Sequence, residues 1–212
     1  MHDPTHKFSG EISPGAENVA KIISLVEQPP FLSIPPFIAI CVSQCGDTWS
    51  AVICSFICIL TATILPISII AFFAKKYNNA DKLDVYKKEE RFLPLICGVL
   101  SYFLGVALLY LVGAPLLATV LMLCYALVTG AIFLITPYWK ISIHSCGVIG
   151  PSMGLAAAFW PWGLLYFLLL PPVIWSRYVL QKHTPLQLVM GAVVGFVITA
   201  IIFYAFSISI IS

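Results

Sequence analysis

Charged residues are scarce in this chain of 212 residues: they make up 9% of it, against 60% hydrophobic residues, and the mean hydropathy is +1.00. Soluble globular domains carry about 25% charged residues, so this composition excludes an ordinary water-soluble fold. The net charge is only +2, and no basic stretch outside the apolar segments is interleaved with aromatic residues. Nucleic acid is therefore not an expected partner.

Metal-binding clusters and a disulfide framework are missing as well. The seven cysteines lie mostly within apolar runs, and an odd number at such positions is typical of small buried side chains. Cys41 and Cys45 are four residues apart, as are Cys54 and Cys58, but no histidine or carboxylate pair accompanies them. A zinc site needs such further ligands, so these cysteines do not predict one.

The N-terminal region is the most polar part of the chain. Residues 1–15 contain no basic segment that leads into an apolar stretch, so no cleavable signal peptide is expected. Residues 16–28 carry apolar side chains at helical spacing, which predicts a short helix in the membrane interface or a lead-in helix packed on the bundle. We divide the chain into this arm and interfacial helix, 1–28, and a single membrane-embedded domain, 29–212.

Long apolar segments make up the rest of the chain. A hydrocarbon core of about 30 Å takes roughly 20 helical residues to cross, which allows about six or seven crossings. The sequence therefore predicts an all-α, polytopic membrane helix bundle. The uncharged stretch from Phe92 to Thr136 is long enough to cross and return as a hairpin, with a break at Gly113 to Pro115. The other apolar segments are Phe31 to Gln44, Thr48 to Ala74, His144 to Phe159, Pro161 to Arg177 and Thr184 to Ile211.

Three polar segments are separated from one another by two crossings each. They run from Lys75 to Arg91, from Lys140 to His144 and from Arg177 to His183. Two crossings return a chain to the side it left, so all three segments must lie at the same membrane face. Polar residues in a membrane protein are costly and usually functional, so an active site is expected at that face.

The polar residues of these segments are rich in cations and imidazoles. Arginine presents a planar fork of donors that fits phosphate oxygens, and lysine adds a point charge. Two histidines near neutral pH can supply a nucleophile and a proton donor. The set predicts a site for an anionic phosphoryl group, and its members are Lys87, Lys88, Arg91, Ser142, His144, Ser176, Arg177 and His183.

The last of the three segments resembles the type 2 phosphatidic acid phosphatases, the lipid-phosphatase branch of the superfamily that includes vanadium haloperoxidases. The third motif of that family is Ser-Arg, five residues, His, three residues, Asp. The sequence SRYVLQKHTPLQ has Ser176, Arg177 and His183 in register, with Gln187 in place of the aspartate.

The other two motifs of the family are matched less fully. The second, Pro-Ser-Gly-His, corresponds to ISIH, which keeps Ser142 and His144. The first is Lys, six residues, Arg-Pro, and KKEERFLP keeps Arg91, with Asp84 at the lysine position and proline only at Pro94. The motifs occur in the family's order over about residues 85 to 195.

The resemblance implies a two-step hydrolysis of a phosphomonoester or diphosphate that needs no metal and no cofactor. His183 would attack phosphorus to form a phosphohistidine. His144 would protonate the departing lipid oxygen and later activate water. The phosphate oxygens would be held by Arg177, Arg91, Ser142 and one of Lys87 or Lys88.

Two roles are open for Gln187. Thr184 to Gln187 reads as a helix start with a capping box, in which Gln187 would serve only as a cap. Its spacing of four residues from His183 would alternatively let its amide oxygen accept from the Nδ1–H group of the imidazole. That bond would orient the ring without the negative charge of the family's aspartate.

The distribution of charge and apolar residues bears on sidedness and substrate. All eleven Lys and Arg residues fall in the N-terminal arm or the motif-bearing segments, which by the positive-inside tendency places the site at the cytoplasmic face. No soluble domain is left to enclose a free sugar or nucleotide. The expected substrate is therefore a lipid phosphate or an isoprenyl (di)phosphate, with its tail in the bilayer.

Three other classes compete with a phosphatase. The loss of the aspartate favours a catalytically inactive protein that binds lipid phosphate. A small transporter with a cationic vestibule would more naturally show repeats and broken helices at midplane. A magnesium-dependent prenyl transferase could use Asn78, Asp81 and Asp84, but only half of an aspartate-rich pattern is present.

Overall fold

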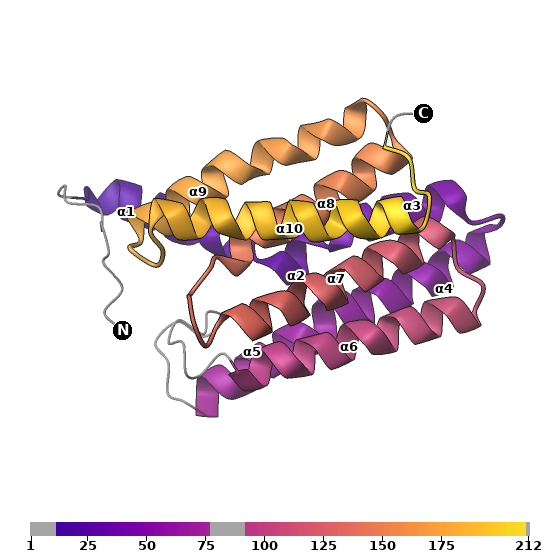
Figure 1. Cartoon of the computed structure of the whole chain (residues 1–212), viewed down its shortest axis with the longest axis horizontal. Helices are drawn as coiled ribbons and strands as arrows, with labels where there is room; N and C mark the ends of the chain where they lie inside the picture. The colour runs from indigo at the N-terminus through magenta and orange to yellow at the C-terminus, as the bar shows by residue number, and fades with distance from the viewer. Residues whose placement is uncertain (1–11, 77–91, 211–212) are drawn as a thin grey trace.

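The computed structural model describes residues 12–76 and 92–210, and these residues form helices and short connections without any strand. The helices lie side by side along the long axis of the molecule (Figure 1). The expected all-α bundle is therefore confirmed. Its elements are α1 (Pro14–Val26), α2 (Pro29–Leu32), α3 (Ile34–Gln44), α4 (Thr48–Ile59), the π-helical turn η1 (Leu60–Ile64), α5 (Leu65–Lys76), α6 (Phe92–Leu111), α7 (Leu116–Ile135), α8 (Ile143–Ala158), the 3-10 helix η3 (Trp162–Leu169), α9 (Leu170–Val179) and α10 (Pro185–Ala205).

Four helical segments of the described chain are long and apolar enough to cross a membrane: Thr48–Lys76, Phe92–Leu111, Leu116–Ile135 and Pro185–Ala205. A fifth would combine α1 with Pro29–Gln44, which meet at a bend of 55°. Helix α8 is apolar but has only 16 residues. The number of candidate spans is thus four or five, and the expected six or seven are not confirmed.

The hairpin expected between Phe92 and Thr136 is confirmed as α6 and α7. Gly113 adopts a left-handed φ of +67°, which costs glycine little because it has no Cβ. The Ala114 N–H donates to the Leu109 carbonyl at 2.9 Å, and the Gly113 N–H donates to the Tyr110 carbonyl at 3.2 Å. This pair of bonds is a Schellman motif, so the sequence break closes α6 and turns the chain back.

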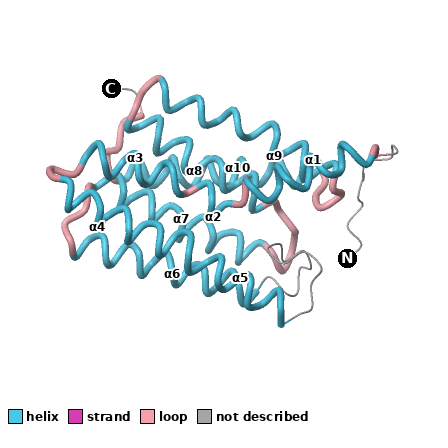
Figure 2. Tube along the Cα trace, turned by 180° about the vertical axis from the view of Figure 1, so that it is seen from behind, coloured by secondary structure: helices cyan, strands magenta, loops and turns pink. Residues whose placement is uncertain are grey.

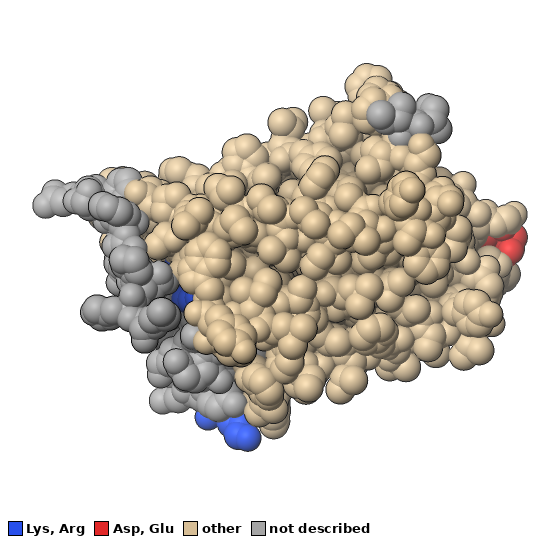
Figure 3. Space-filling view, in the orientation of Figure 1, with Lys and Arg blue, Asp and Glu red and all other residues tan. Residues whose placement is uncertain are grey.

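The sides of the bundle are apolar. Leu100, Leu134 and Ile201, on α6, α7 and α10, are 63%, 67% and 62% exposed. In the space-filling view the flank carries no charged atoms, whereas basic and acidic atoms are visible at opposite ends (Figure 3). An apolar flank between polar ends fits a membrane-embedded protein.

Both ribbon views show where the polar segments lie. Helices α5 and α7 end, α8 begins, and α9 turns into α10 at the same end of the molecule (Figures 1 and 2). The connections α3–α4, α6–α7 and α8–η3 lie at the other end. This arrangement is the one that counting crossings predicted for the described parts of the three segments.

Helix α8 is the centre of the bundle, with eleven of its 16 residues buried. It packs closely against α10 because glycines face it there. A Cβ at Gly191 would collide with the carbonyl of Ser142, and one at Gly195 would lie 3.0 Å from the Cys146 carbonyl oxygen. The start of α8, which carries the second motif, and the first turns of α10, where the third motif ends, are therefore held together.

Candidate active site

The second motif lies at the start of α8. Ser142 is the N-cap residue, and its hydroxyl oxygen accepts from the Ser145 backbone N–H at 3.3 Å and from the Ser145 hydroxyl at 3.2 Å. A serine cap of this kind satisfies a backbone donor that the helix leaves open. His144 follows in the first turn and is buried. The positive end of the α8 dipole therefore lies beside this imidazole, where it favours a bound anion.

Arg177 lies in the last turn of α9 and is only 1% exposed. Its Nη1 donates to the hydroxyl of Ser24 on α1 at 2.7 Å. The negative end of a helix dipole favours a cation, so the position at the end of α9 suits the guanidinium. A buried charge needs bonded partners, and Ser24 supplies one of them from the N-terminal helix.

The turn between α9 and α10 brings His183 back into the bundle. The Lys182 N–H donates to the Arg177 carbonyl at 3.0 Å, and the Gln181 N–H donates to the Tyr178 carbonyl at 2.9 Å. Gln181 adopts a φ of +54°, a conformation that favours glycine. This second Schellman motif ends α9 sharply, and His183 is buried two residues later.

Gln187 fills both roles that the sequence left open. Thr184 caps α10 with its side chain, and Gln187 Oε1 accepts from the Thr184 N–H at 3.1 Å, which completes the capping box. The same Oε1 lies 3.3 Å from Nδ1 of His183. An amide oxygen has two lone pairs, so it can accept from both groups.

This geometry assigns the tautomer of His183. The Thr184 N–H needs an acceptor, which identifies the facing amide atom of Gln187 as oxygen rather than nitrogen. Because that oxygen is an acceptor, the hydrogen bond requires a proton on Nδ1 of His183. In the neutral ring Nε2 then keeps its lone pair, which is the form of imidazole that a nucleophile needs.

Two hydrogen bonds join the chain segments that carry the second and third motifs. The Ser142 N–H donates to the Gln187 carbonyl at 3.1 Å. Lys140 Nζ donates to the Lys182 carbonyl at 3.3 Å. The segments around His144 and His183, about 40 residues apart in sequence, are thus side by side. Lys87, Lys88 and Arg91 of the first motif lie outside the described residues, so their role stays a prediction.

Helix α1 contributes residues that the sequence analysis did not single out. Several of its apolar side chains are exposed, with Ile22 at 63% and Val26 at 62%, whereas Ser24 in the helix and Glu27 directly after it are buried. The buried stripe packs against α9. A small or polar residue at every third or fourth position was the available signal, but it is a weak one.

Glu27 follows α1 and precedes α2, outside the four long spans. Its Oε2 has no hydrogen-bond partner among the described residues. Burial, which disfavours the charged carboxylate, raises the pKa of Glu27 to about 7. This carboxyl group therefore titrates near neutral pH. It lies at the end of α1, the helix whose Ser24 accepts the hydrogen bond from Arg177.

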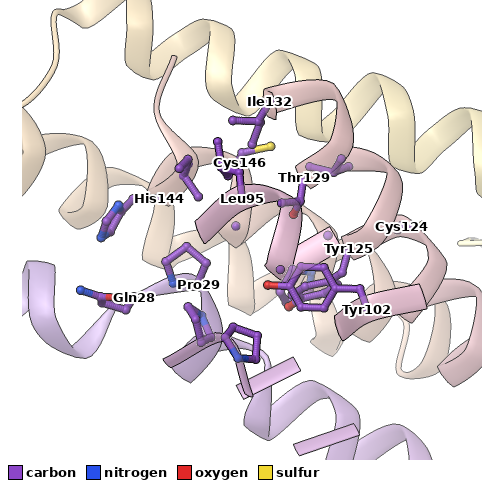
Figure 4. Close-up of a pocket in the computed structure, with 18 of the residues that line it drawn as sticks. Gln28, Pro29, Leu95, Tyr102, Cys124, Tyr125, Thr129, Ile132, His144 and Cys146 are labelled. Atoms are coloured by element: carbon purple, nitrogen blue, oxygen red, sulfur yellow. The ribbon is translucent and has the colours of Figure 1, made fainter. Parts of the chain in front are cut away.

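A cavity opens beside His144 inside the bundle (Figure 4). Gln28 and Pro29 from the start of α2 border it next to His144, and Tyr102 and Tyr125 border it farther along α6 and α7. Most of its lining is apolar. The candidate site therefore adjoins space that could hold the apolar part of a ligand.

No protein-family model, curated protein or solved structure matches this chain. Among residues 12–76 and 92–210, no three His, Cys, Asp or Glu side chains are grouped so that they could hold a metal ion. What the site does must therefore be inferred from its own residues and from the motif resemblance.

Proposed function

We propose that this chain is an integral-membrane phosphatase that hydrolyses a lipid phosphate or an isoprenyl (di)phosphate through a phosphohistidine. The observation that carries the proposal is the bond between buried His183 and Gln187, from Nδ1 to Oε1, directly after the end of α9 that carries Arg177. This bond leaves Nε2 of His183 as the nucleophilic nitrogen. The adjoining start of α8 supplies a second imidazole, His144.

The proposed first step is an in-line displacement at phosphorus. Nε2 of His183 forms the bond to phosphorus while the bond to the lipid oxygen breaks, and a protonated His144 donates its proton to that oxygen. In the second step neutral His144 takes a proton from water, which attacks phosphorus and breaks the bond to nitrogen. Phosphate leaves, and both rings return to their starting states.

Arg177 is the proposed holder of the phosphate oxygens among the described residues. The bond from Nη1 to Ser24 orients its planar fork, whose donors match the oxygens of a phosphate. Charge that builds up on those oxygens in the transition state is then stabilised by a group that is already in place. Lys87, Lys88 and Arg91 are proposed to share this task.

The proposed topology adds crossings to the four long spans. Helix η3 and α9 together run from Trp162 to Val179, and at about 2.0 and 1.5 Å per residue they cover about 31 Å. Helix α8 covers about 24 Å and is shielded by its neighbours. With the segment from Pro29 to Gln44, the chain would cross seven times and keep its basic residues at the cytoplasmic face.

The test is phosphate release from a panel of lipid phosphates by purified protein in the presence of a chelator. We expect release by the wild type and at least a 10³-fold loss in His183→Ala and Arg177→Ala. His6→Ala, in the N-terminal arm, is the matched histidine control and should keep the activity. Acid quenching should trap labelled phosphate on the wild type but not on His183→Ala.

Other outcomes identify the competing classes. Release that requires magnesium and survives His183→Ala would favour the prenyl transferase. Binding of lipid phosphates without release would favour the inactive binder, the candidate that the uncharged Gln187 supports.

A further inference from the structure

The cavity beside His144 is too large to be a packing defect. Its volume is about 120 Å³, measured to the centre of a water-sized sphere, whereas one water needs about 10–15 Å³ on that measure. Parts of α5, α6, α7, α8 and α10 line it, together with the start of α2. It therefore has room for a chain of roughly ten small atoms or groups.

The cavity runs inward from the site along the helices. On α6 both Pro94 and Tyr102 line it, and on α7 both Ile132 and Cys124 do. Each pair is separated by eight residues, which is about 12 Å along a helix. The end with His144 lies at the site, and Tyr102 and Tyr125 border the other end (Figure 4), about halfway along α6 and α7.

Two tyrosines form the inner end. The rings of Tyr102 and Tyr125 meet edge to face with centroids 5.6 Å apart, and Phe37 backs Tyr125 at 5.6 Å. Both tyrosines are buried, and a packed aromatic cluster of this kind yields little to a ligand that pushes against it. The pair therefore sets the depth of the cavity.

Tyr125 also offers an unused polar group. Its side chain is 8% exposed, and its hydroxyl has no hydrogen-bond partner among the described residues. A buried hydroxyl without a partner is costly, which points to a ligand that supplies a partner. The ester carbonyls of a glycerolipid lie only a few bonds from its phosphate and would not reach the inner end, about 12 Å from the site.

We infer that this cavity binds the first part of an isoprenyl chain, an inference that rests on the proposed function. Tyr102 and Tyr125 determine how much of the chain the cavity accepts. At about 1.2 Å per bond, 12 Å corresponds to about ten chain atoms, which is close to the ester oxygen and the eight main-chain carbons of two isoprene units. The double bonds of such a chain present π electrons to the Tyr125 hydroxyl, whereas a saturated chain presents none. A cavity of about 120 Å³ also suits one chain better than the two of a diacyl lipid.

Isoprenyl alcohols test this inference without any phosphate chemistry. We would measure their dissociation constants in detergent for one to four isoprene units, beside saturated alcohols of equal length. We expect affinity to rise at least threefold from one unit to two and to stay level from two to four. Tyr125→Phe should remove an at least twofold preference for the isoprenyl over the saturated chain and keep the length limit.

Two glycines allow the cavity to be shortened. A Cβ at Gly98 or Gly150 would lie 3.9 Å from Tyr102 and Tyr125 respectively, so alanine fits at both positions and fills space at the inner end. The Gly98→Ala/Gly150→Ala variant should move the length limit to one unit. Gly130→Ala, on α7 outside the cavity and 4.0 Å from Val99, is the matched control and should leave the limit at two.

Affinity that keeps rising to four units, or a limit that the double variant does not move, would overturn the inference. So would equal affinity for isoprenyl and saturated chains in the wild type. Because the alcohols carry no phosphate, a length limit without any phosphate release from lipid phosphates would contradict the proposed function and leave the cavity assignment intact. Phosphate release without a length limit would support the proposed function and overturn the cavity assignment.

Discussion

Arg177, in the last turn of α9, and His183, in the connection to α10, are six residues apart, but different parts of the chain position them. His183 is bonded to Gln187, four residues later on the helix that the same turn begins. Arg177 is bonded to Ser24, 153 positions earlier, and only because α1 packs against α9. The imidazole is thus positioned by local sequence, whereas the guanidinium is positioned by the fold. Changes near Gln187 and changes in α1 should therefore have separable effects.

The largest effect is expected from changes to Gln187, which positions His183 through a local hydrogen bond. Gln187→Glu keeps the reach of the side chain and places a negative oxygen beside Nδ1 of His183, which stabilises the imidazolium and should raise kcat about tenfold. Gln187→Leu removes both the orientation and the cap and should lower kcat about 100-fold. Phosphate release under saturating substrate measures both. A wild type without activity that gains it in Gln187→Glu would identify an inactive binder.

Ser24→Ala removes the long-range hydrogen bond that positions Arg177. A hydrogen bond from a charged donor contributes about 1.5–3 kcal/mol, so kcat/KM should fall by about tenfold or more. The binding of inorganic phosphate should weaken in parallel, since Arg177 would lose its orientation. Ile22→Ala, on the exposed face of the same helix, is the control. An equal loss in both variants would mean that α1 acts only through its general packing.

Glu27→Gln tests the same helix through pH. The pKa of Glu27 is raised to about 7, so the folded state binds the proton more tightly than the unfolded state, whose value is about 4.3. Stability from this group is present below about pH 4.3 and is lost as the pH rises through 7. Relative to wild type, the glutamine variant should gain about 1–2 kcal/mol between pH 5 and pH 8. Thermal unfolding of wild type and variant at pH 5 and pH 8 measures this difference in stability, with Glu17→Gln as the control. A stability difference that is the same at both pH values would contradict the prediction.

The smallest effect is expected in the turn itself. Gln181 adopts a φ of +54°, which favours glycine, so Gln181→Gly should stabilise the protein by about 0.5–1 kcal/mol. A rise in the unfolding temperature without loss of phosphate release would show that the turn, and with it the position of His183, tolerates the change. A lower unfolding temperature would show that the glutamine side chain outweighs its backbone strain.

Local features were the ones that could be predicted. The capping box from Thr184 to Gln187 and the break at Gly113 depend on neighbouring residues, and both occur as expected. The direction in which α1 faces could not be predicted from its polarity. In lipid an apolar face needs no protein cover, so Ile22 can be exposed while Glu27 is buried.

Long-range features were out of reach for a related reason. The bond between Ser24 and Arg177 pairs two helices that no motif connects, and Ser24 is one of many serines in the chain. Counting apolar residues predicts six or seven crossings, whereas four or five segments of the described chain are long enough by themselves, and α8 is not among them because it is short and surrounded by other helices. A helix that is covered by protein can be shorter than the hydrocarbon is thick, so length alone does not reveal it.

Gly191 allows the segments that carry the second and third motifs to pack closely. Its single hydrogen leaves room for the Ser142 carbonyl, and even one added methyl group would have to push α8 and α10 apart. Such a wedge would carry His144 and His183 away from each other without altering either ring. A residue without a side chain thus limits how far apart the two imidazoles lie. A substitution of Gly191 would then lower the proposed activity without removing any of the proposed catalytic groups.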